Sequence, residues 1–509
     1  MAFAAPIVYL VVEVVADGRF GSVLGSNRAL APLGTTLALA STVTASAATL
    51  GTALAWLIVR CDLPARRVFA ALAALPLVLP SFVAAGALVD ALGPSGLLTD
   101  LIEPLGWTAP ARPEGFGWAW VVLTLFTYPY VYLPVAARFS ALPPSVEEAG
   151  TMLGRSRRQV FARLVLPQAA SAIGAGALLV FLYVVSEFGA VVLLRVDTLT
   201  RVIYANRLID QPLSLALSLL LGVVALGVVA AERTVARRGD VPIRRSGPPP
   251  LVPLGPWRPV ALLAAATTVA LTLVVPCAVL ISWVIRGVRA TGRSSLAVDV
   301  PDLLSASFNT AAASLGAALV AVAVVLPVAL AVGRHRSRVG ELAQSVITAG
   351  FALPGIVIAL SLISWTLATD LGASLYQTFP LLIGAYVVHF GAQAVRASHA
   401  AVATAPLRLV ESARMLGASR LRRLGRVELP LMVPGLAAGA GLVMLSTMKE
   451  LPVTLLLAPT GFTTLATRIW SRYEESFIPE AGVAALTLVA LSGVLTWLLV
   501  VRTSRDLAA

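Results

Sequence analysis

Residues Glu147 to Pro167 read EEAGTMLGRSRRQVFARLVLP, and residues Glu411 to Pro430 read ESARMLGASRLRRLGRVELP. Glutamate, methionine, glycine and a Leu-Pro pair recur in them at the same offsets, as the matched glycines Gly154 and Gly417 illustrate. Both segments are rich in arginine and glycine, whereas the rest of the chain is strongly apolar. The pair therefore predicts a polar loop that is repeated in two similar membrane-embedded halves.

The composition indicates a protein of the lipid bilayer. Apolar residues make up 58% of the 509 residues and charged residues only 12%, against roughly 25% charged residues in soluble domains. A spanning helix needs about 20 mostly apolar residues. We therefore expect an all-α polytopic membrane protein with about twelve transmembrane helices, near residues 2–15, 33–59, 68–90, 116–137, 169–190, 213–231, 259–285, 310–333, 345–367, 379–395, 431–448 and 481–501.

A linker separates two sets of six predicted helices. Residues 237–257 read RRGDVPIRRSGPPPLVPLGPW, and their prolines, glycines and arginines suit a semi-rigid cytosolic connection. The first transmembrane domain is then residues 1–236, and the second is residues 258–509. Because an even number of helices separates the copies, the two six-helix repeats run parallel to each other.

A second internal match supports the duplication. Two predicted helices end in an arginine, Arg60 in the first half and Arg334 in the second. A basic loop follows each of them, and then an apolar run that contains Leu-Pro, at 79–80 and at 353–354. The separation between the two arginines is the same as that between the two Leu-Pro pairs.

The distribution of charge predicts the orientation. If both repeated loops are cytosolic, the loops on that side hold 26 of the 38 basic residues and 9 of the 25 acidic ones. That side carries +17 and the remainder −4, in agreement with the positive-inside rule. Both chain termini are then cytosolic. The net charge of +13 reports this topology, so it requires no nucleic-acid partner.

The repeated segment predicts a helix, a turn and a second short helix. A helix that begins at Pro144-Ser145 places Glu148 and Met152 one turn apart on one face. Gly154 then ends it, because glycine tolerates the left-handed conformation after a helix C-terminus. A helix from Pro406 repeats the arrangement in the second copy. An interfacial loop that binds anionic lipid is the alternative, but two copies in register favour a docking hairpin.

The spacing resembles the EAA motif of type I ABC importer permeases: glutamate, two small residues, glycine four positions later, then an aliphatic residue and Leu-Pro. Leu164 and Val427 are the aliphatic residues, and the likeness covers nearly all of the chain as two fused permease domains of MetI-like fold. It implies that each hairpin is a coupling helix that enters a groove on one subunit of a dimer of cytosolic ABC ATPases. Gly150 and Ser412 stand where alanine is usual, and both are small. The implied coupling residues are Glu148, Ala149, Gly150, Met152, Gly154, Glu411, Ser412, Ala413, Met415 and Gly417.

The sequence predicts no ATP site in this chain. A Walker A loop needs a lysine on the phosphates, and the chain's one lysine, Lys449, lies in no such loop. ATP and Mg²⁺ are therefore expected on the partner ATPase, and we expect neither catalytic residues nor a bound cofactor here. The histidines and cysteines are too scattered to indicate a firm metal site; they are His335, His389, His399, Cys61 and Cys277.

Two further carboxylates, Glu187 and Glu450, have the same separation as the matched glycines and lie at the predicted outer end of the helix after each motif. Ionisable groups at membrane depth are costly unless they line a water-filled path or find a partner. The pair could face a common pore and favour a hard cation, which prefers oxygen ligands. Alternatively each carboxylate pairs locally, Glu450 with Lys449 or Arg468 and Glu187 with Arg195.

The flanking strings SEFGAVVLLRVDTLT, residues 186–200, and KELPVTLLLAPTGFTTLATRIW, residues 449–470, give a narrower resemblance. They are similar to the corresponding parts of fused ferric-ion importer permeases. This implies a bacterial plasma (inner) membrane protein that receives ferric iron from an extracytoplasmic binding protein, either periplasmic or lipid-anchored. Permeases for thiamine and other small solutes share the fused plan, so these cargoes stay open. A twelve-helix secondary transporter is a further alternative, although it would not need a docking hairpin in each half.

Overall fold

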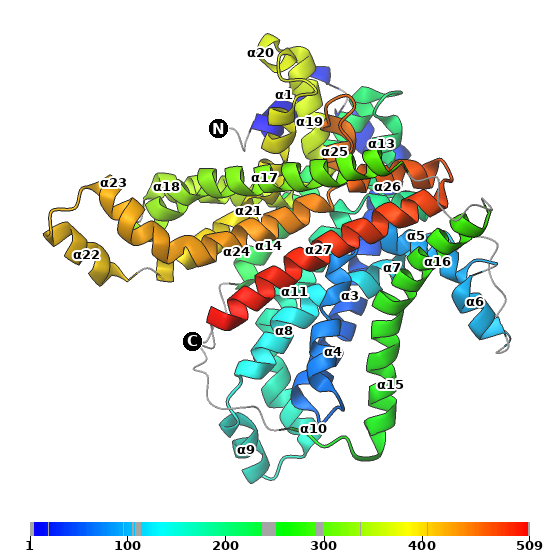
Figure 1. Ribbon diagram of the computed structural model, residues 1–509, viewed down its shortest axis with the longest axis vertical. Helices are drawn as coiled ribbons and strands as arrows, with labels where there is room; N and C mark the ends of the chain where they lie inside the picture. Colours follow the sequence, from blue (N-terminus) through cyan, green and yellow to red (C-terminus); the bar gives the residue numbers. More distant parts are fainter. Residues whose placement is uncertain are drawn as a thin grey trace. The chain divides into compact units, whose positions relative to one another are not determined.

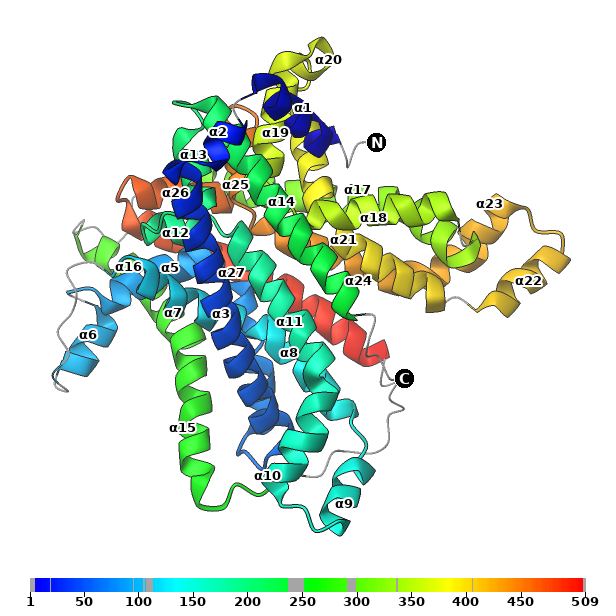
Figure 2. The ribbon, with the colours of Figure 1, turned by 180° about the vertical axis from the view of Figure 1, so that it is seen from behind.

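The structure, a computed structural model, is helical almost throughout, as predicted. It describes residues 5–18, 20–94, 96–103, 106, 113–236, 251–290, 299–335, 337–404 and 406–506, and within these ranges the β-structure is one isolated bridge, between Cys61 and Val252. The chain forms two compact units (Figure 1, Figure 2). Unit 1 comprises Met1–Val23, Ile203–Leu226 and Val284–Ala509, and unit 2 comprises Leu24–Val202 and Gly227–Trp283.

Unit 2 holds most of the first half, and its core is the mutual packing of α3, α8 and α11. Gly51 of α3 lets the backbones approach closely, because a Cβ there would lie 2.8 Å from the carbonyl oxygen of Tyr128. The helices of this unit are α3 (Asn27–Arg60), α4 (Arg66–Leu72), η1 (Leu75–Val78), α5 (Ser81–Leu92), α6 (Leu97–Ile102), α7 (Phe116–Thr127), α8 (Pro129–Ala141), α9 (Ser145–Met152), α10 (Arg157–Val160), η3 (Phe161–Val165), α11 (Leu166–Ser186), α12 (Gly189–Leu193), η4 (Gly255–Trp257), α15 (Arg258–Val269) and η5 (Ala270–Val274).

Unit 1 holds most of the second half, and its core is the mutual packing of α17, α21 and α24. Its helices are α1 (Ala5–Asp17), α17 (Val300–His335), α18 (Arg338–Ala352), α19 (Gly355–Ala368), α20 (Asp370–Ala373), α21 (Phe379–Thr404), α22 (Leu407–Met415), α23 (Arg420–Arg423), η6 (Leu424–Glu428), α24 (Leu429–Met448), α25 (Pro452–Leu457), α26 (Leu465–Glu474) and α27 (Ile478–Asp506). Four helices run across a boundary between the units: α2 (Phe20–Leu24), α13 (Leu199–Asn206), α14 (Gln211–Ala236) and α16 (Val275–Ala290).

The compact units and the sequence halves divide the chain differently. Helix α1 belongs to the unit that holds most of the second half, and α15 belongs to the unit that holds most of the first. Of the predicted linker, residues 237–250 lie outside the described residues. The remainder is tied into unit 2, where the backbone of Val252 donates to the carbonyl oxygen of Arg60 at 2.7 Å.

The duplication extends to individual hydrogen bonds. In unit 2, Thr36 Oγ1 accepts a 2.9 Å hydrogen bond from the backbone N–H of Leu199. In unit 1, Thr310 Oγ1 accepts a 2.8 Å hydrogen bond from the backbone N–H of Leu465. The two threonines have the same separation in sequence as the arginines that end the two long helices. Each bond ties a long helix, α3 or α17, to the first residue of a short helix, α13 or α26.

Within the described residues, all twelve predicted spans contain helix, although they differ in length and straightness. Among the described residues, eight helices are long and apolar enough to cross a membrane, and two bent pairs raise the number to ten. The remaining two predictions correspond to α1, which has only 13 residues, and to α21, which is 26 residues long. Helix α21 carries His389, Gln393 and Arg396, which lower its mean hydropathy.

The stretches predicted as continuous helices at 68–90 and 345–367 are wrong in that respect, because each is broken at its Leu-Pro pair. The segments on either side of 79–80 meet at 103°, and those on either side of 353–354 at 106°. A residue before proline is pushed towards extended backbone, and Leu79 has φ −78° and ψ 128° while Leu353 has φ −74° and ψ 129°. The recurrent Leu-Pro therefore marks a repeated break in the helix.

Three other prolines are absorbed by π-helical turns. The turn Phe161–Val165 is followed by Leu166-Pro167, the turn Leu424–Glu428 by Leu429-Pro430, and the turn Ala270–Val274 by Val275-Pro276. Proline inside a helix removes one backbone hydrogen bond and crowds the carbonyl four residues earlier. A wider π turn accommodates that loss without ending the helix. The second short helix of each repeated loop is thus joined to α11 or α24 as one continuous helical span.

Candidate functional site

The first repeated loop is the predicted helix, turn and helix. Helix α9 has Leu153 as its C-cap, and Gly154 follows with φ +75°. The N–H of Gly154 donates to the carbonyl of Thr151 at 2.9 Å, and the N–H of Arg155 to that of Gly150 at 3.2 Å. These two bonds form a Schellman motif. A Cβ at Gly154 would meet no heavy atom within 4 Å, so the left-handed backbone, and not packing, requires glycine.

The second loop repeats this geometry in α22. Leu416 is the C-cap, and Gly417 has φ +78°. The N–H of Gly417 donates to the carbonyl of Arg414 at 3.0 Å, and the N–H of Ala418 to that of Ala413 at 3.0 Å. The same Schellman motif thus occurs at the same position in two loops that are far apart in the sequence. An irregular interfacial loop would not require this repeated geometry. We call residues 145–165 and 407–428 the first and second hairpins.

The departure from alanine at Gly150 has a packing reason. Gly150 is buried, and a Cβ there would lie 2.8 Å from Leu164 Cδ1 and 2.9 Å from Val160 Cγ2. The second hairpin has Ala413 at this position and Val427 in place of Leu164. Glycine with leucine and alanine with valine have the same number of side-chain carbons, so the substitutions compensate for each other in volume.

The hairpins expose apolar side chains at their turns. Met152 is 86% exposed and Leu153 76%, and the matched Met415 and Leu416 are 88% and 87% exposed. Beside them, the motif residues Glu148, Ala149, Glu411 and Ser412 are exposed too. Each hairpin stands at one end of its helices, α9 near the ends of α8 and α11, and α22 near the ends of α21 and α24 (Figure 1). Each therefore offers a partner a surface with an apolar tip and a carboxylate.

Comparison with known proteins agrees with this geometry. The family model described as "Binding-protein-dependent transport system inner membrane component" matches residues 47–238 and again residues 323–507. The chain belongs to this family. It is a fused, two-domain permease of an ABC importer, and each matched region contains one hairpin.

Individual relatives cover different shares of the permease. The Fe(3+)-transport system permease protein FbpB 2 of Haemophilus influenzae is 30% identical over 97% of this chain and 94% of its own length. The molybdenum transport system permease protein ModB of Azotobacter vinelandii is 31% identical over 33% of this chain and 74% of its own length. A solved structure of the MetNI methionine ABC transporter is similar to 40% of this chain and 94% of the matched chain, at 19% identity and a TM-score of 0.32.

The carboxylates Glu187 and Glu450 lie at the far ends of the helices that the hairpins begin. Helix α11 has 21 residues and α24 has 20, so each carboxylate is about 30 Å along its helix from the hairpin, at 1.5 Å per residue. This distance matches the hydrocarbon thickness of a bilayer. Glu187 and Glu450 thus lie at the opposite ends of α11 and α24 from the hairpins.

Each carboxylate caps the short helix that follows it and faces a broken span. Glu187 accepts hydrogen bonds from Ala190 N at 2.9 Å and from Ser81 Oγ at 2.8 Å. Glu450 accepts from Val453 N at 3.2 Å, and His389 Nε2 lies 3.8 Å from its other oxygen. A Cβ at Gly355 would lie 2.6 Å from Glu450 Oε1. Ser81 and Gly355 directly follow the prolines of the two breaks, so the carboxylates mark equivalent places in the two repeats.

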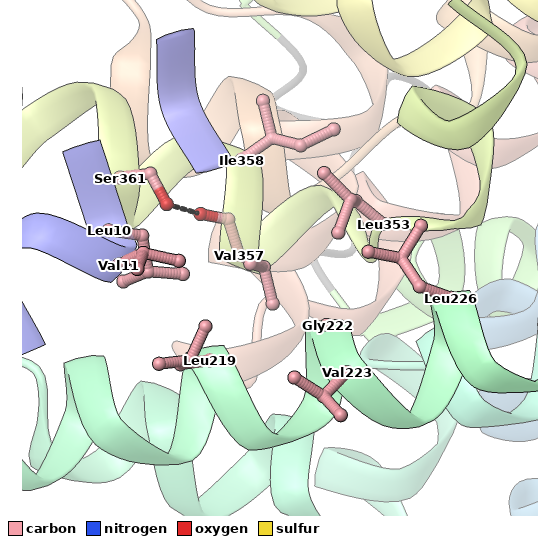
Figure 3. Close-up of a pocket in the computed structure, with 10 residues that line it drawn as sticks. All are labelled: Leu10, Val11, Leu219, Gly222, Val223, Leu226, Leu353, Val357, Ile358 and Ser361. Atoms are coloured by element: carbon pink, nitrogen blue, oxygen red, sulfur yellow. Dashed lines mark hydrogen bonds between the residues drawn. The ribbon is translucent and has the colours of Figure 1, made fainter. Parts of the chain in front are cut away.

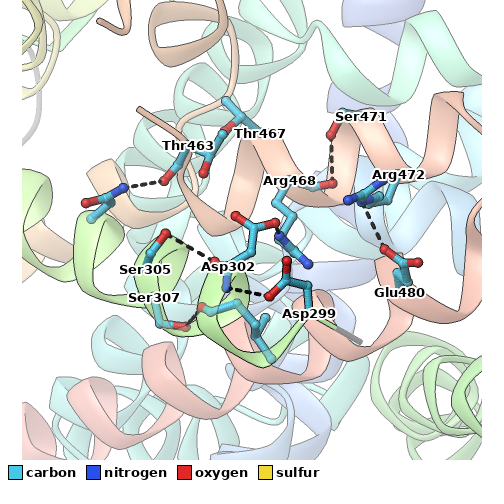
Figure 4. Close-up of polar contacts among 12 residues, drawn as sticks. Asp299, Asp302, Ser305, Ser307, Thr463, Thr467, Arg468, Ser471, Arg472 and Glu480 are labelled. Atoms are coloured by element: carbon cyan, nitrogen blue, oxygen red, sulfur yellow. Dashed lines mark hydrogen bonds and ion pairs between the residues drawn. The ribbon is translucent and has the colours of Figure 1, made fainter. Parts of the chain in front are cut away.

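The arginines suggested as local partners of these carboxylates are paired with other acids. Arg195 lies 3.5 Å from Glu114. Arg468 is 4% exposed and forms an ion pair with Asp302 of α17 (Figure 4). The contacts described above for Glu187 and Glu450 are with hydroxyl, backbone and imidazole groups, and the local-pairing alternative stays a prediction.

An apolar pocket of about 160 Å³ in unit 1 is no candidate for a charged cargo. Figure 3 shows its lining from α1, α14, α19 and the Leu-Pro break that precedes α19. Its one polar side chain, Ser361, donates to the carbonyl of Val357 at 2.6 Å. Among the described residues, no group of three or more His, Cys, Asp or Glu side chains could hold a metal ion.

Sequence reasoning missed several polar neighbours of the predicted sites. Ser81 and His389 contact Glu187 and Glu450 from distant parts of the chain. The position of Ser81 directly after a recurrent Leu-Pro was the available signal. His389 could have been noticed as an imidazole within an apolar run, where an ionisable group calls for a partner.

Proposed function

We propose that this permease imports ferric iron, driven by two cytosolic ABC ATPase subunits that bind its two hairpins. The observation that carries the docking is the repeated, exposed Met-Leu pair at the turn of each hairpin. Exposed apolar groups rimmed by polar residues are typical of protein interaction sites. A carboxylate one turn before each methionine, Glu148 or Glu411, adds a charged contact at the rim.

The two hairpins divide their residues between shape and contact. Gly154 and Gly417 set the turn, and Gly150 and Ala413 close the first helix onto the segment that follows. Glu148, Ala149, Met152, Glu411, Ser412 and Met415 then form the surface that meets the ATPase. ATP and Mg²⁺ belong to that partner, because this chain has a single lysine and no phosphate-binding loop.

The proposal of ferric iron rests on the similarity over the whole chain to the Fe(3+)-transport permease. The molybdenum relative matches only a third of this chain, and the sulfate permease of Escherichia coli only 28%. Those cargoes are oxyanions, whereas the repeated Glu187 and Glu450 add negative charge near the predicted outer face. Carboxylates favour a hard cation over an anion. An extracytoplasmic binding protein delivers the iron in this scheme.

The proposed orientation puts both hairpins and both chain termini in the cytosol of a bacterium. The excess of arginine in the loops on that side supports it. ATP binding draws the ATPase subunits together, the hairpins move with them, and the helix bundles open towards the binding protein. Such coupling requires the ATPase and the binding protein each to favour one global state of the permease.

Reconstitution tests the cargo separately from the docking. The permease, a candidate ABC ATPase and a ferric-binding protein are placed in liposomes, and uptake of radioactive Fe³⁺ is compared with uptake of molybdate and sulfate. We expect ATP-dependent uptake of iron alone. Uptake of an oxyanion instead would refute the cargo and leave the docking intact, whereas uptake without any ATPase would indicate a secondary transporter.

A further inference from the structure

Arg60 is a buried charge at the junction between the first hairpin and the helix bundle. It is the last residue of α3 and is 0% exposed. Its Nη1 donates to the carbonyl of Phe139, near the end of α8, at 3.2 Å. Its guanidinium also forms an ion pair with Glu147 of α9. One side chain thus joins α3, α8 and the first hairpin.

The same place is also tied to the segment that connects the two halves. Val252 N donates to the carbonyl of Arg60 at 2.7 Å, and Asp62 N donates to that of Val252 at 3.2 Å. Asp62 Oδ1 accepts a further bond from Leu254 N at 2.8 Å. These bonds fix the backbone around Arg60, so the guanidinium is held where Glu147 meets it.

The second half has a matching arginine with a different carboxylate. Arg334 is the counterpart of Arg60 in the repeat, and its Nε lies 4.0 Å from Glu428 Oε2. Glu428 is 6% exposed, and its other oxygen accepts from Arg423 Nε at 3.1 Å. Glu428 is in the π turn at the end of the second hairpin, whereas Glu147 is at the start of the first.

The two carboxylates are not equivalent positions in the repeat. The counterpart of Glu147 in the second copy is Val410, and the counterpart of Glu428 in the first copy is Val165. Arg60 and Arg334 occupy equivalent positions in the two repeats. Their carboxylate partners lie at opposite ends of the two hairpins. A buried guanidinium without a partner is costly, and each half meets this need with an acid of its own hairpin.

We propose that Arg60 and Arg334 are positioning residues that latch each hairpin to the end of a long helix, α3 or α17. Movement of a hairpin is then transmitted directly to these helices. In the first half a ring contact adds to the latch, because Trp56, one turn before Arg60, lies 4.2 Å from Phe161 between ring centroids. The transmission of force rests on the proposed docking of the ATPase; the latch itself does not.

Hydrogen exchange on the full chain in lipid nanodiscs tests the latch without any partner. The variants are Glu147→Leu, Arg60→Met and the double variant, which removes both charges and leaves no unpaired ion. We expect amides of residues 145–160 to exchange at least tenfold faster in all three. The control is Arg195→Met with Glu114→Leu, a partly exposed pair of the same unit, and it should leave these amides unchanged. Unchanged exchange in the double latch variant overturns the proposal.

Relocating the carboxylate tests whether its position in the hairpin is interchangeable. The variant Glu147→Val with Val165→Glu gives the first hairpin the arrangement of the second. We expect protection to return to within threefold of the unaltered chain. A folded variant that exchanges as fast as Glu147→Val alone contradicts the proposal.

Coupling is measured on the reconstituted complex of the latch double variant, as iron imported per ATP hydrolysed. This ratio should fall at least threefold while the ATPase still co-purifies. An unchanged ratio contradicts the latch. An ATPase that fails to co-purify with the unaltered chain refutes the docking instead, and the exchange result stands.

Discussion

Substitution of Gly417 separates backbone strain from packing at the second hairpin. The residue has φ +78°, and a Cβ there would meet no heavy atom within 4 Å. Any loss on substitution therefore comes from the left-handed backbone, which costs an L residue about 1–2 kcal/mol. Gly417→Ala should carry this cost, and Gly417→Val a larger one, because a β-branched residue is a true outlier at positive φ. Gly417→Asn should lose least, since asparagine is several-fold enriched among the non-glycine residues at positive φ.

The strain acts on the two hydrogen bonds that end α22. A cost of about 1–2 kcal/mol lowers the population of the closed turn by about 5- to 30-fold relative to the open one, because 1.4 kcal/mol corresponds to a factor of ten. Hydrogen exchange of the Gly417 and Ala418 amides, which donate to Arg414 and Ala413, reports that population. Co-purification with the ATPase should fall in the same order, from Asn to Ala to Val.

A glycine in the same hairpin gives the matched control. Gly425 lies in the π turn, has no positive φ, and would also accept a Cβ without contact. Gly425→Ala should be neutral or slightly stabilising, because alanine is favoured over glycine within a helix. If Gly417→Val, alone and with Gly154→Val, bound the ATPase and transported as the unaltered chain does, the left-handed turn would have no part in docking.

Three further predictions concern other parts of the permease. Gly51→Ala should lower the apparent Tm of the purified permease, because its Cβ would lie 2.8 Å from the backbone of Tyr128. Gly34→Ala in the same helix has open space around the new Cβ and should leave the Tm unchanged. Equal Tm values for the two variants would contradict the close packing of α3 on α8. Burial raises the pKa of the Cys61 thiol to about 11. At pH 7.5 its reactive thiolate is therefore scarce, and a maleimide should label Cys61 only after denaturation. Rapid labelling of Cys61 in the native chain would show that the site is open. The double variant Glu187→Gln, Glu450→Gln keeps the side-chain shape and removes both charges. Fe³⁺ uptake should therefore fall well below that of the unaltered complex while ATPase binding persists. Unchanged uptake would mean that the two carboxylates serve only to cap α12 and α25.

Local signals in the sequence were sufficient to predict the hairpins. A glycine shortly after the last helical methionine predicts a left-handed C-terminus, and both copies have it. The same holds for the eight described helices that are long and apolar enough to cross a membrane, because each contains a continuous apolar run. The breaks at the Leu-Pro pairs could have been read from proline chemistry, but hydropathy alone joined the segments into single spans.

Contacts between distant residues could not be predicted in this way. Arg60 meets Glu147 and Ser81 meets Glu187 through the packing of separate helices, and nothing local to either residue names its partner. The repeat also could not predict the acidic partners of Arg60 and Arg334, because Glu147 and Glu428 occupy different positions of the motif. The assignment of helices α1 and α15 to compact units likewise depends on tertiary packing, which the order of the halves does not contain.

The stoichiometry of the complex tests the central claim most directly. Native mass spectrometry of the permease with its ATPase should give two ATPase subunits for each chain. Met152→Asp and Met415→Asp, each placing a charge at one exposed tip, should each reduce that number to one, and together to none. A complex with two ATPase subunits that persists in the double variant would contradict docking through the hairpins.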